Sequence, residues 1–143
     1  MVTTIGIDPH KATHTAVAID ESETVLGELT VPADWYQTRK LIEWASGLNG
    51  DGRLWAVEAA GGLGYLLSQQ LIAHGEQVVD VPAVLASRVR VLSSGRSDKN
   101  DPNDARSVAI AALRQPGLAV VRREDHTQVL RMLAKRHLER LLP

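Results

Sequence analysis

Four acidic residues of this 143-residue chain are placed where their carboxylates could act together: Asp8, Glu58, Asp101 and Asp104. Asp8 and Glu58 each end a short apolar run that predicts a buried strand. The other two stand three residues apart at a predicted helix start, so they share one helix face. Carboxylates beside a core are costly unless a cation neutralises them. Four that converge are what a Mg²⁺ site for phosphoryl transfer requires, with Mn²⁺ as a substitute.

Each of these acids also has a simpler interpretation when it is taken alone. Asp8 precedes Pro9, and an Asp-Pro pair commonly starts a turn. Glu58 could reach solvent where its strand ends. Asp101 is followed by Pro102 and then by an acid at the third helical position, which is typical of helix capping. Only the convergence of all four favours a metal site over these separate interpretations.

Basic residues are unevenly distributed along the chain. Residues 1–83 hold 4 Lys and Arg against 11 Asp and Glu, whereas residues 84–143 hold 12 against 6. An acidic half that could bind metal, followed by an Arg-rich half, suits a polyanionic partner such as nucleic acid, although solvated helix faces would give the same asymmetry. The candidate contacts to a nucleic-acid backbone are Lys11, Arg88, Arg90, Arg96, Lys99 and Arg106.

Two further motifs carry weaker signals. His10 and His14 straddle a turn and have no matching third ligand, which argues against a zinc site. The glycine-rich stretch 59–64 could cradle a phosphate at a helix start, but its spacing matches neither a dinucleotide fingerprint nor a P-loop. Close packing of a helix on a strand is the favoured explanation for these glycines.

The elements that must position the acids follow from hydrophobic periodicity and turn residues. Five strands are predicted, at residues 3–8, 13–20, 24–31, 53–58 and 77–81. Five helices are predicted, at residues 33–48, 63–74, 82–92, 102–114 and 127–142. The last helix is amphipathic, and we expect it to pair with a second copy of the chain or to fold back on the core.

The order of these elements predicts an α/β fold with a mixed sheet. Three strands joined by short turns indicate an antiparallel meander, and the following βαβ steps require parallel pairing. We expect helices on both faces of the sheet, as in the ribonuclease-H-like fold. That order brings the ends of the first and fourth strands together, where Asp8 and Glu58 lie.

Composition places the chain in a broad class. An apolar content of 44% and a charged content of 23% are typical of a globular protein. The chain has no cysteine, which excludes disulfides and thiolate metal sites. No apolar run reaches the roughly 18 residues of a membrane helix, and the early charged residues do not fit a signal peptide. We therefore expect a cytoplasmic protein without a membrane partner.

Taken together, three stretches resemble the N-terminal domain of the DEDD transposases of the insertion-sequence-110 group, which are similar to the Piv-type DNA invertases. These stretches are IGIDPHKATHTAVAID, AVEAAGGLGYLLSQQL and VPAVLASRVRVLSSGRSDKNDPNDARSVAIAAL. The resemblance runs from about residue 3 to 142 and includes all four acids in order. The GRSDKNDPNDA block is its most specific part.

The resemblance implies a RuvC-like, ribonuclease-H-type domain in which Asp8, Glu58, Asp101 and Asp104 are catalytic and bind Mg²⁺. It also implies a DNA transposase or recombinase, guided in many family members by a structured bridge RNA, and working as a homodimer or higher oligomer. Family members carry a later domain with a serine nucleophile, and no serine here matches that motif. We therefore expect a catalytic domain at 1–117, the start of a helical dimerisation or linker region at 118–143, and no complete recombination by this chain alone.

The sequence leaves two alternative functions open. The chain could be a non-catalytic fragment that binds nucleic acid or dimerises. More remotely, the strand–turn–strand motif GIDPHKATHTAVAID resembles the phosphate-binding hairpin of actin-like kinases, but 143 residues leave no room for the second lobe of such a fold.

Overall fold

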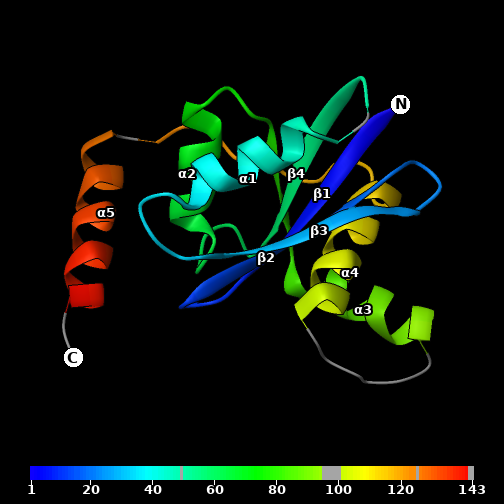
Figure 1. The fold of residues 1–143 in the computed structure, drawn as a ribbon. Helices are drawn as coiled ribbons and strands as arrows, with labels where there is room; N and C mark the ends of the chain where they lie inside the picture. Colours follow the sequence, from blue (N-terminus) through cyan, green and yellow to red (C-terminus); the bar gives the residue numbers. More distant parts are fainter. Residues whose placement is uncertain (49, 95–100, 125, 142–143) are drawn as a thin grey trace.

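The chain folds around one mixed five-stranded sheet in the computed structural model (Figure 1). The structure describes residues 1–48, 50–94, 101–124 and 126–141, with side chains except at 91–94, 101–102, 126–129 and 140–141. The strands are β1 (Val2–Pro9), β2 (Thr13–Ile19), β3 (Val25–Pro32), β4 (Gly52–Glu58) and β5 (Val78–Val81). Their order across the sheet is β3-β2-β1-β4-β5.

The strand pairing confirms the predicted topology. β1, β2 and β3 form the antiparallel meander, while β4 pairs in parallel with β1 and with β5. Because β1, β4 and β5 run the same way, their carboxyl ends lie along one edge of the sheet. The start of β2 and the end of β3 lie at the same edge, since Thr13 pairs with Pro32.

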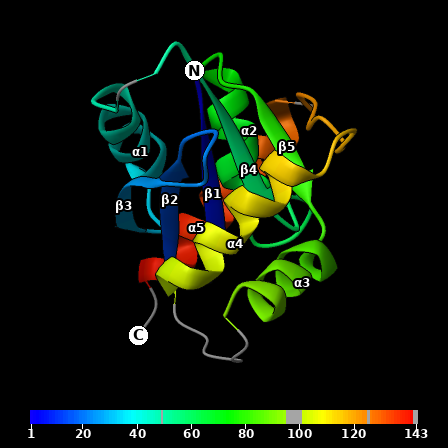
Figure 2. The ribbon, with the colours of Figure 1, turned by 90° about the vertical axis from the view of Figure 1, so that its right-hand side faces the viewer.

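Helices cover both faces of the sheet, as predicted (Figures 1 and 2). The helices are α1 (Gln37–Ser46), α2 (Tyr65–Ala73), α3 (Ala83–Ser94), α4 (Asp101–Arg114) and α5 (His126–Leu141). Side chains alternate between the faces of each strand. Ile5 and Ile7 of β1 join the core beneath α1 and α2, while Ala56 of β4 joins the core that includes α3 and α4. The α/β fold class with two helical layers is therefore confirmed.

One predicted boundary is wrong: α1 begins at Gln37 and not at residue 33. Asp34 ends the preceding segment in a turn, where its Oδ1 accepts a hydrogen bond from the Tyr36 N–H at 2.9 Å. A short polar side chain that bonds the backbone two residues on competes with helix formation. Trp35, which fits the helical periodicity in the sequence, lies outside the helix and is 46% exposed.

A glycine in β1 sets the distance between α4 and the sheet. A Cβ atom at Gly6 would lie 2.1 Å from the Ala105 carbonyl oxygen and 2.5 Å from the Ala109 nitrogen. Both are backbone atoms of α4, so the helix axis approaches β1 closely only because residue 6 has no side chain. Asp8 lies two residues further along β1, and α4 begins one turn before Ala105. Gly6 therefore brings the start of α4 to the carboxyl end of β1.

The last helix, α5, folds back beside α2 (Figure 1). The segment before it is tied to α2, since the Gln69 amide donates to the Arg122 carbonyl oxygen at 2.9 Å. The Trp35 indole N–H donates to Nδ1 of His137 on α5. Leu130 and Leu138 of α5 remain 51% and 61% exposed. Folding back, one of the two predicted alternatives for this helix, is therefore what the single chain adopts. Within the described residues no helix has both the length and the apolar character needed to cross a membrane.

Candidate active site

Asp8 and Glu58 lie side by side at the carboxyl edge of the sheet. Ile7 of β1 pairs with Val57 of β4 in parallel register, so the next residues of both strands are neighbours. Alternation directs both acids to the face that α4 covers, because Gly6 and Ala56 precede them by two residues on that face. Asp8 is only 6% exposed, and Glu58 is half-buried.

The carboxyl groups of Asp8 and Glu58 are joined by a hydrogen bond, and the pKa of each is raised. Burial, together with the neighbouring Asp8 charge and the hydrogen bond to Asp8, raises the pKa of Glu58 to about 7. Burial also raises the pKa of Asp8. Two carboxylates this close cannot both ionise without a cation. A divalent cation at this pair would favour the ionised form of both acids.

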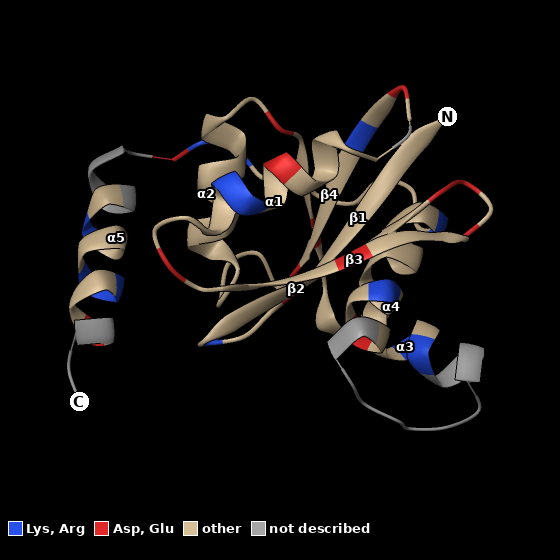
Figure 3. Cartoon of the chain, in the orientation of Figure 1, with Lys and Arg blue, Asp and Glu red and all other residues tan. Residues whose placement is uncertain are grey.

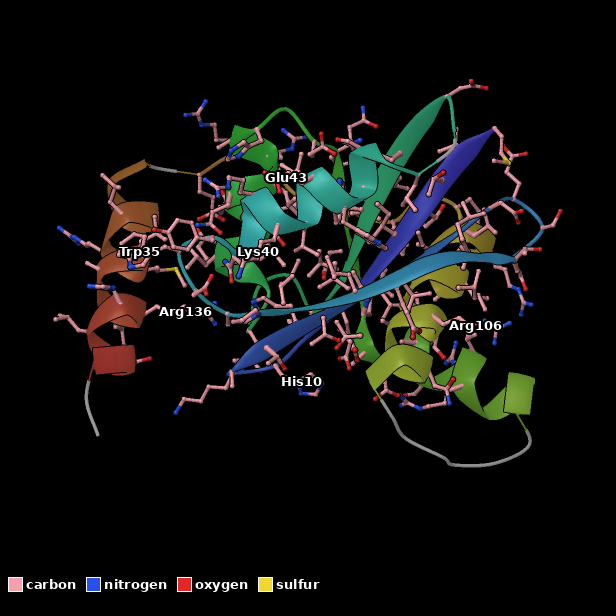
Figure 4. The ribbon with its side chains drawn as sticks, viewed as in Figure 1. His10, Trp35, Lys40, Glu43, Arg106 and Arg136 are labelled. Atoms are coloured by element: carbon pink, nitrogen blue, oxygen red, sulfur yellow. The ribbon has the colours of Figure 1, made fainter. Side chains whose placement is uncertain are left out.

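His10 is a second partner of Asp8, and the sequence reasoning missed it. Its Nε2 lies 2.8 Å from Asp8 Oδ2 at the exposed end of the β1–β2 hairpin (Figure 4). This contact opposes the rise in the pKa of Asp8. His14 is separate: it is fully buried, and its Nε2 lies 3.0 Å from Gln37 Oε1. The Asp-Pro-His sequence could have predicted this contact, because it puts an imidazole two residues after the acid at a turn.

Asp104 reaches the same site from α4. Its negative charge raises the pKa of both Asp8 and Glu58, so the three carboxylates are close enough to repel one another. Asp104 is held by Arg90 of α3, whose Nη1 donates to Asp104 Oδ1. The two side chains are 15% and 14% exposed, which makes this a partly buried ion pair. Sequence spacing did not predict that the pair would form.

The fourth acid is only partly described. Asp101 begins α4, as its predicted place at a helix start requires, but its side chain lies outside the described residues. The metal and capping interpretations of Asp101 therefore remain predictions. Arg96 and Lys99, two of the predicted nucleic-acid contacts, also lie outside the residues that the structure describes.

The turn after Glu58 is held in an unusual backbone conformation. Ala59 has a φ of 48°, in the left-handed region that residues other than glycine rarely adopt. Asp80 of β5 fixes this turn, since its Oδ1 accepts a hydrogen bond from the Ala60 N–H at 2.7 Å. A Cβ at Gly64 would lie 2.5 Å from Val57 Cγ1, so the glycine permits close packing of α2 on the strand end. This packing supports the structural explanation of the glycine-rich stretch and holds Glu58 at the site.

The other predicted nucleic-acid contacts lie on different elements of the fold. Figure 3 marks Lys and Arg positions in blue on α3, α4 and α5. Lys11, in the β1–β2 turn, and Arg88, on α3, are exposed. Arg106 is half-buried on α4 (Figure 4), and its charge helps to lower the pKa of Glu23 in the β2–β3 turn. A role in binding nucleic acid stays a prediction for all of them.

The donor chemistry of this site fits Mg²⁺ or Mn²⁺. Asp8, Glu58 and Asp104 offer only carboxylate oxygens, which are the ligands of hard divalent cations. Within the part of the chain that the structure describes, however, no three acidic or imidazole side chains are close enough to hold an ion. The Arg90 ion pair engages one of the candidate ligands. A metal would therefore require Asp104 to change its partner.

The raised pKa of Glu58 predicts how the stability of the fold depends on pH. The pKa of Glu58 is raised from 4.5 to about 7, so the folded state binds more protons than the unfolded state between these values. Its contribution to the free energy of unfolding therefore falls as the pH rises through that window. His14 acts in the opposite sense, because burial lowers its pKa to about 4 and its protonation opposes folding as the pH falls below 6.5.

Comparison with Glu58→Gln isolates the carboxyl group from His14. In urea denaturation with a chelator present, we expect the variant to gain stability relative to the wild type as the pH rises from about 5 to about 8. Both proteins keep His14, so its contribution cancels in the difference. A difference that is constant across this range would contradict the raised pKa of Glu58.

Comparison with known proteins agrees with this geometry. The family model for transposases of the DEDD, insertion-sequence-110 type matches residues 5–141. A 44.8 kDa uncharacterized protein of insertion element IS116 from Streptomyces clavuligerus is 37% identical over 105 residues. The match covers 73% of this chain and 26% of that protein.

Solved structures of RuvC share the fold. Thermus thermophilus RuvC in complex with a Holliday junction substrate superposes with a TM-score of 0.61 and 12% identity, covering 85% of this chain and 100% of RuvC. A second Thermus thermophilus RuvC structure gives a TM-score of 0.59 and 13% identity, covering 83% and 99%. At this identity the likeness shows the fold alone, whereas the family match spans nearly the whole chain. The chain belongs to the DEDD transposase family of the insertion-sequence-110 group, and the part described here has the RuvC-like fold.

Proposed function

We propose that this chain supplies the acidic, metal-binding part of a DNA transposase that catalyses phosphoryl transfer on DNA. The observation that carries the proposal is the adjacency of Asp8 and Glu58, which are hydrogen-bonded at the ends of two parallel strands, while the charge of Asp104 raises the pKa of both. Carboxylates in this state are poised to exchange a proton for a cation.

In the proposed site, Asp8, Glu58 and Asp104 hold Mg²⁺ together with Asp101. The ion, when bound, would activate the attacking water or hydroxyl and neutralise charge on the phosphoryl oxygens. Asp8 is central because it lies between Glu58 and His10, and it is the most buried of the three described acids. The Ala59 turn, fixed by Asp80, keeps Glu58 directed at its neighbour.

The proposed substrate is DNA, held through its backbone. Lys11 and Arg88 are exposed at or near the carboxyl edge of the sheet, where cationic side chains can contact phosphates. We extend the proposal to the other predicted contacts, Arg90, Arg96, Lys99 and Arg106. A bridge RNA guide, a homo-oligomeric assembly and a boundary between domains near residue 117 belong to the same proposal, as features of the longer protein.

A nicking assay tests this function. Supercoiled plasmid and branched DNA are incubated with the chain and Mg²⁺, Mn²⁺ or a chelator, and strand breaks are counted. We expect breaks with either metal and none with the chelator. DNA binding without breaks in either metal would contradict a catalytic role for this chain.

The second candidate function is a nucleic-acid-binding and assembly module. It is favoured by one observation, the ion pair that Asp104 forms with Arg90. In that case DNA affinity would be independent of Mg²⁺ and would fall steeply with salt.

A further inference from the structure

Arg90 is a largely buried cation beside the acids. Its Nη1 donates to Asp104 Oδ1, and its Nη2 donates to Ser87 Oγ at 3.0 Å on the same helix. The guanidinium is therefore held by α3 on one side and by α4 on the other. Its side chain is 15% exposed, well below that of a solvated surface arginine.

The charge of Arg90 reaches a second acid of the site. It lowers the pKa of Glu58, whereas burial and the neighbouring carboxylates raise that pKa. Arginine stays protonated at any pH at which the protein folds. Arg90 is thus a fixed positive charge that lowers the pKa of Glu58.

We propose that Arg90 is an internal counter-ion of the metal site, and that it competes with a divalent cation for Asp104. This inference rests on the proposed function, since it concerns how the same acids take up their metal. A divalent ion and the Arg90 guanidinium compete for the Asp104 carboxylate, because two cations at one carboxylate repel each other. Metal uptake then requires the Arg90–Asp104 pair to open.

Opening the pair has a consequence for nucleic acid. An arginine released from its carboxylate leaves a fork of N–H donors beside the site, and phosphate is the group that such a fork binds best. Metal and DNA should therefore each favour the binding of the other through Arg90, since coupling between two sites is reciprocal. The ion pair thus keeps the acids neutralised until both partners are present.

Titration of the chain with Mn²⁺ by calorimetry tests the competition. We expect Arg90→Gln to bind Mn²⁺ about tenfold more tightly than the wild type, within the usual range of coupling between sites. Arg90→Lys, which keeps the charge, should stay close to the wild type. The matched control is Arg114→Gln, which breaks another arginine–carboxylate pair of α4, with Glu23, at the opposite end of the helix and should not change Mn²⁺ affinity.

A second measurement separates charge competition from damage to the fold. Without metal, Arg90→Gln should melt at a lower temperature because Asp104 loses its partner, and Mn²⁺ should raise its melting temperature more than that of the wild type. In the background of Asp104→Asn, the substitution of Arg90 should lose most of its effect on Mn²⁺ affinity.

The outcomes distinguish this inference from the proposed function. Equal or weaker Mn²⁺ binding by Arg90→Gln, with tight binding by the wild type, would overturn the competition and leave the function standing. Absence of Mn²⁺ binding in both folded proteins would overturn both. Binding by Arg90→Gln alone would support the inference in its strongest form, with Arg90 excluding the metal.

Discussion

Asp8→Asn is expected to lower Mn²⁺ affinity by about 100-fold or more and to abolish metal-dependent breakage of DNA. Replacement of partners outside the first ligand shell already costs about 10- to 100-fold in metal affinity at other sites, and Asp8 is proposed as a direct ligand. The amide removes one negative charge but keeps nearly the same shape. Calorimetric titration with Mn²⁺ and the nicking assay measure the two effects.

Stability distinguishes this result from simple misfolding. Burial and the neighbouring acids disfavour the ionised form of Asp8, so its neutral amide should leave the free energy of unfolding unchanged or higher at about pH 8 without metal. Asp51→Asn is the control, because its carboxylate is 89% exposed at the opposite edge of the sheet. If Asp8→Asn kept the Mn²⁺ affinity of the wild type, Asp8 would not be a metal ligand.

Gly6→Ala is expected to destabilise the domain by about 3 kcal/mol or more. The added methyl would lie 2.1 Å from the Ala105 carbonyl oxygen, and a helix backbone cannot yield as a flexible side chain can. Relief would require α4 to move away from β1. Since α4 carries Asp104, the folded fraction should also bind Mn²⁺ more weakly. Urea denaturation followed by circular dichroism gives the loss of stability.

Gly52→Ala provides the comparison for that loss. Gly52 begins β4, is exposed, and nothing lies within 4 Å of the Cβ that alanine would add. We expect its free energy of unfolding to change by about 0.5 kcal/mol or less. Equal effects of the two substitutions would mean that the close approach of α4 to β1 does not set the stability of the fold.

The sheet could be predicted because its signals are local. Each strand is a short apolar run bounded by turn residues, and the connections between them leave few topologies. Adjacency of Asp8 and Glu58 followed from that order alone. The predicted start of α1 was wrong because Trp35 fits the helical spacing of apolar residues. The hydrogen bond from the Tyr36 N–H to the Asp34 side chain, which forms the turn before α1, does not show in that spacing.

The partners of the acids could not be predicted, because they depend on packing between elements. Arg90 meets Asp104 only because α3 and α4 pack together beneath the sheet, and periodicity does not give that orientation. Asp80 of β5 accepts a hydrogen bond from the Ala60 N–H, which follows the neighbouring strand β4. Gly6 is conspicuous only once α4 is known to lie against it.

The most direct test of the central claim is a crystal of this chain soaked in Mn²⁺, with anomalous density sought at the carboxyl edge of the sheet. We predict one or two peaks between Asp8 and Glu58, with Asp104 turned from Arg90 towards the ion and Asp101 completing its ligands. Strong peaks elsewhere, or a site without density in which the Arg90–Asp104 pair is intact at saturating Mn²⁺, would contradict the claim that these four acids form a metal centre.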